Sequence, residues 1–332
     1  MTTAEYFAGF GGFRAATEAN DIHTVRSGEL DPYARKAYEA FWGEAPQGMD
    51  VRDEDPNEVP AHDIMTGGFP CQSFSIAGVS KMNSLGRPHG FKDVTRGTLF
   101  FELCRLLDAK RPQAFIFENV KNLTRHDGGQ TFEVVMKSLE GIGYNVAAEV
   151  VDASDWLPQK RERVYIVGFR DDHDAAEVFP MMQRPERPVC LSEILEDEVG
   201  DEFTLWDRTW EYLQQHKLEH AAKGHGFGYT VIEPPFEGKV TRTLVRRYHK
   251  DGSGILIAQE GKNPRKLTPV ECMRLQGFPA EQCEGTIRNG VLSNTRWYMG
   301  FGNAIAVPPI AELVRCVKEV LESWSSLQGP PK

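Results

Sequence analysis

Over the first 170 residues of this 332-residue chain, short apolar runs alternate with segments of helical periodicity. Such runs are typical of buried strands, and their alternation with helices favours a largely parallel, doubly wound sheet. The expected strands lie at residues 5–9, 24–30, 62–68, 113–120, 145–151 and 163–169, and the expected helices at 12–19, 32–42, 98–109 and 130–140. Ligands bind such a sheet beyond the carboxyl ends of its strands. We therefore predict an α/β fold with its site at that edge.

The alternation stops near residue 178, where proline-bounded segments that contain tryptophan begin. Single cores rarely grow beyond roughly 250 to 300 residues, so this length favours two unequal lobes. We expect a main domain over residues 1–177, a smaller mixed domain over 178–262, and a return to the main domain over 263–332. The last helix is expected to pack on the first strand. Trp206 and Trp210, four residues apart on an expected helix, are interpreted as packing residues.

Charge is distributed unevenly along the chain. The net charge of −10 by itself disfavours a nucleic-acid partner. Residues 239–266, however, carry eight lysines and arginines against two acids, and residues 81–96 carry four against one. Runs of this kind are often only solvated faces, so at this point both interpretations stay open.

The chain shows no feature of a secreted, membrane or metal-binding protein. Its start lacks a basic signal-peptide region, and no apolar segment reaches the roughly 20 residues that span a bilayer. The six cysteines are scattered without a CxxC pair, and the histidines show no ligand spacing. We expect a cytoplasmic protein with reduced thiols, no membrane contact and no metal site.

One cysteine lies in the sequence GGFPCQSFS, residues 67–75, directly after an expected strand. Pro70 fixes its own φ and pushes Phe69 toward an extended conformation, so the position of the Cys71 thiol is stiffly defined. A packing cysteine needs no such placement. Residues 70–97 also form a long loop rich in Gly, Ser and basic residues, which is uncommon in a compact domain unless the loop is functional. Cys71 is therefore a candidate nucleophile.

Two further motifs lead to the same sheet edge. Glu118 in FENV ends an otherwise apolar strand, where a carboxyl is costly to bury unless it has a partner. Arg161 and Arg163 in QKRER share one face by the strand period of two. Alone, these arginines would be interpreted as an exposed strand edge. Together with Cys71 and Glu118, they favour a convergent site.

The first expected strand runs into FAGFGG, residues 7–12, where glycines allow a ligand to approach the backbone closely. The spacing is not the full GxGxxG pattern, and a tight turn explains it equally well. Glu29 follows Gly9 by 20 residues and ends the second expected strand, where an acid can bind ribose hydroxyls. Asp50 could accept a hydrogen bond from an adenine amino group. Each acid alone is more often surface charge.

Six segments in this order resemble the bacterial DNA (cytosine-5)-methyltransferases along almost the whole chain. They are FAGFGG, GGFPCQSFS, FENV, QKRERVYIVGF, RKLTPVECMRLQGFP and GNAIAVPP. The resemblance implies a Rossmann-like fold that uses S-adenosylmethionine, with residues 178–262 as a target recognition domain for double-stranded DNA. A cognate restriction endonuclease is a further partner that the resemblance allows, and a monomer is expected.

The resemblance also implies a mechanism. The target cytosine is flipped out of the duplex, and the Cys71 thiolate adds to its C6. Glu118 holds and protonates N3, so that negative charge does not build up on the ring. Arg163 binds the cytosine O2, and Arg161 supports the loop and a neighbouring phosphate.

Binding residues follow from the same resemblance. The expected cofactor-binding residues are Phe7, Gly9, Gly11, Gly12, Glu29, Asp50, Val51, Pro70, Leu99 and Asn303. The expected DNA-binding residues are Gln72, Ser75, Arg96, Thr243, Leu244 and Arg246. Family members commonly carry an aromatic residue after the ribose-binding acid, where this chain has Leu30. Residues 242–257, RTLVRRYHKDGSGILI, are similar to those of the Dcm type, which methylates the inner cytosine of CCWGG.

Three other functions fit parts of the pattern. A transfer-RNA cytosine methyltransferase of the same fold would share Cys71 and Glu118 but usually lacks a full recognition lobe. A nicotinamide dehydrogenase would explain the glycines and Glu29 but would give Cys71 no role. A non-catalytic DNA-binding regulator would explain the basic lobe without requiring the thiol, the acid and the arginine together.

Overall fold

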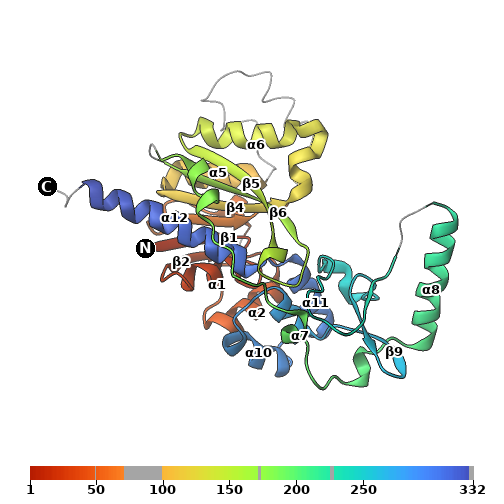
Figure 1. The fold of residues 1–332 in the computed structure, drawn as a ribbon. Helices are drawn as coiled ribbons and strands as arrows, with labels where there is room; N and C mark the ends of the chain where they lie inside the picture. Colours follow the sequence, from red (N-terminus) through yellow and green to blue (C-terminus); the bar gives the residue numbers. More distant parts are fainter. Residues whose placement is uncertain (49, 71–98, 171–172, 225–227, 329–332) are drawn as a thin grey trace.

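The computed structural model of the chain describes residues 1–48, 50–70, 99–170, 173–224 and 228–328. Its centre is a six-stranded sheet in the order β2-β1-β3-β4-β6-β5 (Figure 1). The strands are β1 (Thr2–Tyr6), β2 (His23–Gly28), β3 (Ile64–Gly68), β4 (Ala114–Val120), β5 (Asn145–Asp152) and β6 (Glu162–Phe169). Neighbours pair in parallel except at β6, which is antiparallel to both β4 and β5. The predicted doubly wound, mostly parallel fold is confirmed.

Helices cover both faces of this sheet. One face packs against α1 (Gly12–Glu18), α2 (Pro32–Trp42) and α12 (Val307–Gln328), and the other against α5 (Leu99–Lys110) and α6 (Gln130–Gly141). Strand β4 shows the alternation, because Ile116 joins the first core cluster whereas Phe115 and Phe117 join the second. Burial on both faces explains why the strand is a continuous apolar run.

The final helix returns to the start of the chain, but its main partner differs from the predicted one. Helix α12 packs along α1 rather than chiefly on the first strand. Asn20, just after α1, donates from Nδ2 to the Ala311 carbonyl at 2.9 Å, and the Lys318 Nζ donates to the Asn20 carbonyl at 2.8 Å. Helix α1 follows β1 directly along the chain, so α12 returns to the N-terminal unit mainly through this helix.

A smaller lobe extends from one end of the sheet (Figure 1). Its helices and those that lead back from it are α7 (Leu191–Ile194), α8 (Asp207–Ala222), α9 (Pro269–Leu275), α10 (Ala280–Arg288) and α11 (Asn294–Asn303). Its sheet contains β7 (Val231–Ile232), β8 (Leu256–Gln259) and β9 (Lys262–Lys266) in that order. Because β9 pairs with β8, this sheet runs past the predicted limit at residue 262.

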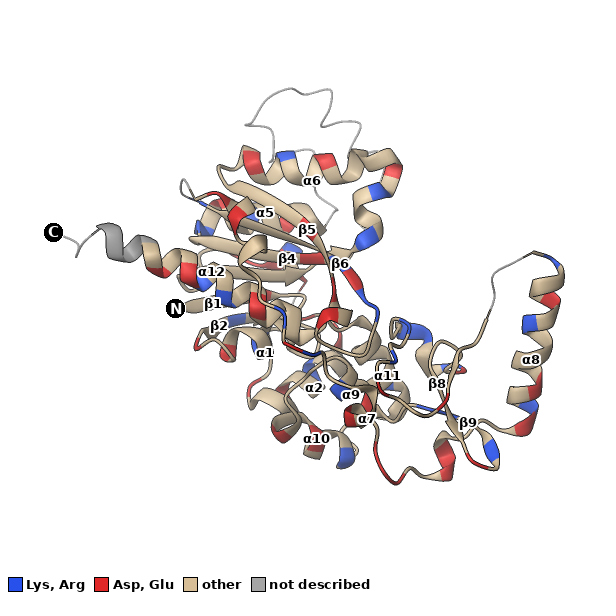
Figure 2. Ribbon diagram, viewed as in Figure 1, with Lys and Arg blue, Asp and Glu red and all other residues tan. Residues whose placement is uncertain are grey.

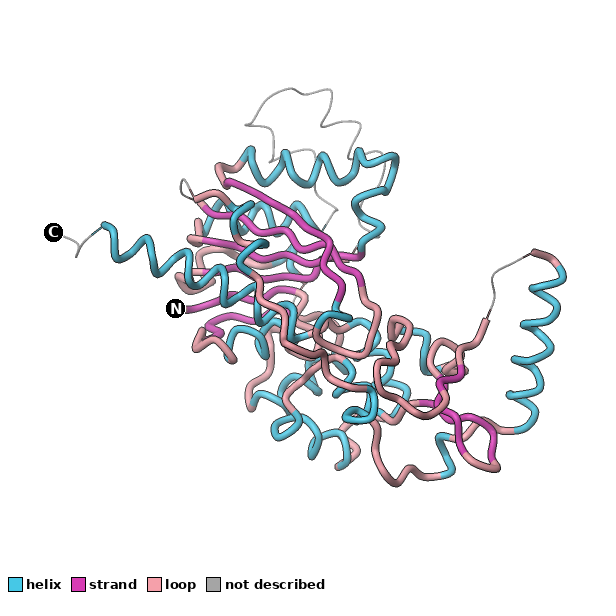
Figure 3. The backbone as a smooth tube through the Cα atoms, in the orientation of Figure 1, coloured by secondary structure: helices cyan, strands magenta, loops and turns pink. Residues whose placement is uncertain are grey.

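Helix α8 stands apart from the main body, as the backbone tube shows (Figure 3), and it carries charges of both signs (Figure 2). Trp210 packs edge-on against Tyr229, with ring centroids 4.8 Å apart. Trp206 is 81% exposed, so its interpretation as a packing residue is wrong. The helix begins only at Asp207, which leaves Trp206 at the N-cap and outside the apolar face. No helix among the described residues is long and apolar enough to cross a membrane.

Candidate active site

The loop between β1 and α1 is shaped by its glycines. Gly9 and Gly11 have φ values of +56° and +83°, in the left-handed region that favours glycine. A Cβ on Gly11 would lie 2.2 Å from the Trp42 indole nitrogen. The Gly9 amide donates to Glu29 Oε2 at 2.8 Å, and the Asp31 amide donates to Glu29 Oε1 at 2.7 Å. Glu29 therefore joins the ends of β1 and β2.

Two predicted site residues, Glu118 and Arg163, meet at the end of the sheet. Arg163 Nε lies 3.0 Å from Glu118 Oε1, and both side chains are largely buried. Strand register explains the contact, because Val120 of β4 is paired with Arg163 of β6. Burial raises the pKa of the Glu118 carboxyl, and the charges of Arg163 and Arg161 partly oppose that rise. Glu118 thus keeps its proton to higher pH than a free glutamate does.

The same strand end is tied to the segment that leads to Cys71. Asn119 Nδ2 donates to the Phe69 carbonyl at 2.7 Å, and Gly68 of β3 is paired with Glu118 of β4. Pro70 therefore lies close to the Glu118 carboxyl, and both line one cavity. Four predicted site residues, Cys71, Gln72, Ser75 and Arg96, lie outside the described residues.

This cavity has a volume of about 630 Å³, which is in the usual range for small-molecule sites. It brings together Phe7, Gly9, Gly12, Glu29, Pro70 and Asn303 with Glu118 and both motif arginines. A glycine loop beside a ribose-type acid fits an adenosine-containing cofactor. A Cβ on Gly12 would lie only 2.5 Å from the Ile305 side chain. The packing of the cavity wall therefore leaves no room for a larger residue at position 12.

Four expected cofactor residues are not among the described residues that line this cavity: Gly11, Asp50, Val51 and Leu99. Asp50 caps the 3-10 helix Val51–Asp53, and both its oxygens are held by Arg52. Val51 is buried, and Leu99 begins α5. The structure therefore does not bring Asp50, Val51 and Leu99 to the cavity, and the contact of these residues with adenine stays a prediction.

Arg161 departs from its expected role. Its side chain is 2% exposed, and its guanidinium donates to the carbonyls of Leu244 at 2.8 Å, Gly302 at 3.3 Å and Ala304 at 2.6 Å. The predicted phosphate contact is wrong for this structure, because these carbonyls hold the group in the interior. Arg161 instead joins the segment around Leu244 to the residues on either side of Asn303.

Leu244 also differs from the prediction of a DNA contact. Its side chain is fully buried. Its amide donates to Gln159 Oε1 at 2.8 Å, and its carbonyl accepts from Arg161. Gln159 is itself fully buried and donates to the Leu275 carbonyl at 3.1 Å. Leu244 therefore anchors its own segment to the main domain, whereas its neighbours Thr243 and Arg246 are more exposed and line the cavities.

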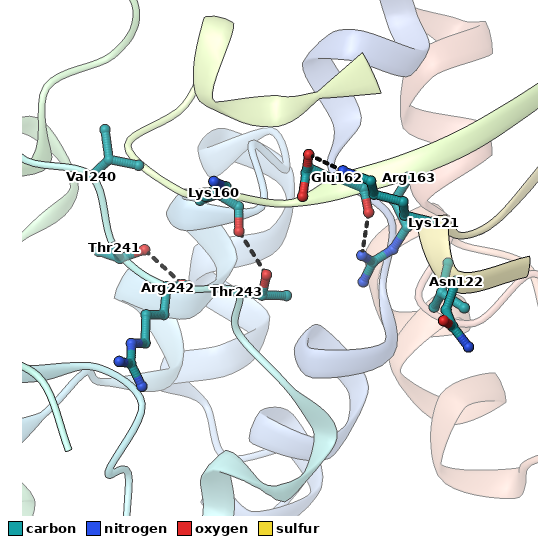
Figure 4. A pocket seen from close by; sticks show the side chains of 10 residues that line it. Lys121, Asn122, Lys160, Glu162, Arg163, Val240, Thr241, Arg242 and Thr243 are labelled. Carbon is teal, nitrogen blue, oxygen red and sulfur yellow. Dashed lines mark hydrogen bonds and ion pairs between the residues drawn. The ribbon is translucent and has the colours of Figure 1, made fainter. Parts of the chain in front are cut away.

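A second cavity, of about 640 Å³, lies beside the first and shares Val120 and Arg163 with it. Figure 4 shows its lining, where Lys121 pairs with Glu162 at 2.6 Å and the Thr243 hydroxyl donates to the Lys160 carbonyl at 2.6 Å. Lys121, Lys160 and Arg242 were not among the predicted site residues. Their signal was their position: Lys121 directly follows FENV, Lys160 lies within QKRER, and Arg242 begins the segment at residues 242–257. The cluster gives this groove a positive lining.

We predict that Arg161→Met lowers the free energy of unfolding by about 2 to 4 kcal/mol. Three buried carbonyls would lose a charged donor, and an unsatisfied buried group costs about 1 to 3 kcal/mol, offset in part by removal of a buried charge. Chemical denaturation measures the difference. Lys160→Met, at an exposed neighbouring position, should change stability by less than about 0.5 kcal/mol. Equal stability of the two variants would contradict the structural role.

The order of the sheet fits a Rossmann-like methyltransferase fold. So do the glycine loop after β1, Glu29 after β2, and Glu118 with its partner Arg163 at the end of β4. The solved structure of the methyltransferase EhMeth of Entamoeba histolytica shares this fold, with a TM-score of 0.74, 18% identity, and coverage of 97% of this chain and 98% of that one. Residues 1–319 match the family model of the C-5 cytosine-specific DNA methylases. The chain belongs to this family and is a DNA cytosine-5 methyltransferase.

Two curated relatives are similar over nearly the whole chain. Type II methyltransferase M1.ScrFI of Lactococcus lactis subsp. cremoris is 43% identical over 332 residues, which cover 96% of this chain and 80% of that protein. Type II methyltransferase M.NlaX of Neisseria lactamica is 42% identical, and the match covers 97% of both chains.

Proposed function

We propose that the protein flips a cytosine out of a specific site in double-stranded DNA and methylates its C5 through a covalent adduct of Cys71. The observation that carries the proposal is the buried Glu118–Arg163 pair, which faces a cavity shared with the glycine loop. A carboxyl with a raised pKa beside a fixed guanidinium matches the N3 and O2 edge of a cytosine. When bound there, S-adenosylmethionine supplies the methyl group.

The residues divide the reaction between them. The Cys71 thiolate forms a bond to C6, and the electron pair that leaves the C5–C6 double bond is made available at C5 as Glu118 gives its proton to N3. Arg163 donates to O2 and holds the ring in the plane of the carboxyl. After C5 has gained the methyl group, its proton passes to water, the C6–sulfur bond breaks and the double bond re-forms. The N3 proton returns to Glu118.

Cofactor placement follows from the cavity. Glu29 is oriented by two backbone amides and would accept from ribose hydroxyls. Phe7, Gly9, Gly11, Gly12, Pro70 and Asn303 would form the surrounding wall, and Asp50, Val51 and Leu99 would bind adenine in a state in which Arg52 has released Asp50. We retain Arg246 and Thr243 as DNA-binding residues, and residues 178–262, extended by β9 to residue 266, as the recognition domain.

Relatives named as Type II methyltransferases support a role in restriction and modification, in the bacterial cytoplasm and beside a cognate endonuclease. The similarity of residues 242–257 to the Dcm type supports a CCWGG-like target. A monomer fits one active site with one recognition lobe.

Bisulfite sequencing tests the function most broadly. A plasmid from a bacterial host without cytosine methyltransferases, expressing this chain, should contain 5-methylcytosine at one position of a short recurring motif. The Cys71→Ser chain, expressed to the same level, should leave the plasmid unmethylated. Methylation without a recurring motif would contradict sequence-specific recognition, and unmodified plasmid with modified transfer RNA would favour the RNA enzyme.

A further inference from the structure

One arginine of the large cavity has no role in the reaction described above. Arg296 lies in the first turn of α11, and its Cζ is 3.6 Å from the centre of the Tyr33 ring at the start of α2. Both residues line the 630 Å³ cavity. Stacking on an aromatic ring covers the face of a guanidinium and leaves its N–H edge free to donate.

The helix face on which Arg296 lies forms one wall of the cavity. Arg296, Met299, Gly300 and Asn303 follow the i, i+3, i+4 and i+7 spacing of a single face, and all four line the cavity. Gly300 contacts the glycine loop so closely that a Cβ there would meet the Phe10 ring at 1.8 Å. The face that carries Arg296 is therefore pressed against the loop that would hold the cofactor.

Acids in the same cavity do not neutralise Arg296. Glu29 accepts from two backbone amides, and Asp31 caps α2 by accepting from the amides of Tyr33 and Ala34. Glu118 is paired with Arg163. Among the described residues, Arg296 forms neither an ion pair nor a side-chain hydrogen bond. Its charge thus faces the cavity without an anionic partner.

We propose that Arg296, held in place by Tyr33, binds the α-carboxylate of the cofactor's amino-acid end. This inference rests on the proposed cofactor, whose ribose is expected at Glu29 and whose only anionic group is that carboxylate. Arg296 is half-buried within the cavity, whereas Arg246 at its margin is exposed and better placed for a phosphate of DNA. A charge-assisted hydrogen bond from Arg296 to the carboxylate should raise the affinity of the site for ligands that carry this group.

Titration calorimetry with two ligands tests the assignment without catalysis. S-adenosylhomocysteine carries the carboxylate, and its decarboxylated analogue differs only by that group. Wild-type protein should bind S-adenosylhomocysteine about 10- to 100-fold more tightly than the analogue, as expected for a hydrogen bond to a charged group. Arg296→Met should weaken S-adenosylhomocysteine by that factor and leave the analogue nearly unchanged, and Arg296→Lys should restore part of the preference.

Arg246→Met is the matched control, since it removes another arginine of the same cavity and should keep the wild-type ligand preference. An Arg296→Met protein that still prefers S-adenosylhomocysteine would overturn the proposal. If that variant also showed a salt dependence of DNA binding reduced by about one phosphate contact, the anion would be a DNA phosphate instead. Wild-type protein that binds neither ligand would overturn the cofactor proposal itself and this inference with it.

Discussion

Glu118→Gln is expected to lower the rate of methyl transfer by about 10²- to 10⁴-fold, because a positioned general acid contributes that much to a reaction. Glutamine has nearly the same shape and can still donate a hydrogen bond to N3, but it cannot give up a proton. Single-turnover transfer of radiolabelled methyl groups to a duplex measures the loss. Binding of the duplex itself should change little, since the carboxyl lies below the surface.

The pH dependence gives an independent check on Glu118. Burial raises the pKa of this carboxyl, so its protonated form persists to higher pH than in free glutamate and is lost as pH rises through the shifted value. The wild-type kcat/KM should therefore fall on the alkaline side of the optimum. Glu118→Gln should lack that fall. A variant with more than a tenth of wild-type activity and an unchanged pH profile would contradict the general-acid role.

Elements of the sheet were predictable because their patterns are local. The runs at 62–68, 113–120 and 163–169 match β3, β4 and β6 to within a few residues. The spacing of apolar residues and the flanking turn residues can both be read directly from the sequence. The meeting of Glu118 with Arg163 was also expected, but the reason differs: β6 runs antiparallel to β4, so its first residues lie at the edge where β4 ends.

Partners of the buried polar groups could not be predicted in the same way. The interior position of Arg161 depends on carbonyls of Leu244, Gly302 and Ala304, which are 83 to 143 residues away along the chain. Nothing in the spacing QKRER distinguishes an arginine that faces a phosphate from one that holds three segments together. The Arg296–Tyr33 stack likewise joins residues far apart in sequence, which no local pattern records.

Loss of the Cys71 thiol is expected to have the largest effect of all. Cys71→Ser replaces a thiolate with a hydroxyl, which remains protonated at neutral pH and is a far weaker nucleophile, so no adduct at C6 should form. Methyl transfer should fall below detection, a loss of at least about 10⁴-fold, since removal of an enzyme's nucleophile costs that much or more. Specific binding of the duplex should persist, because the substitution removes none of the positive charges that bind phosphate.

The most direct measurement is covalent trapping on duplex DNA that contains 5-fluorocytosine at the target position. Fluorine at C5 blocks the final loss of a proton, so the sulfur cannot leave and the protein stays bound to the DNA through denaturing electrophoresis. We predict a trapped complex with wild-type protein and S-adenosylmethionine, and none with Cys71→Ser. Equal trapping of the two proteins would show that another group attacks the ring and would contradict the assignment of Cys71 as the nucleophile.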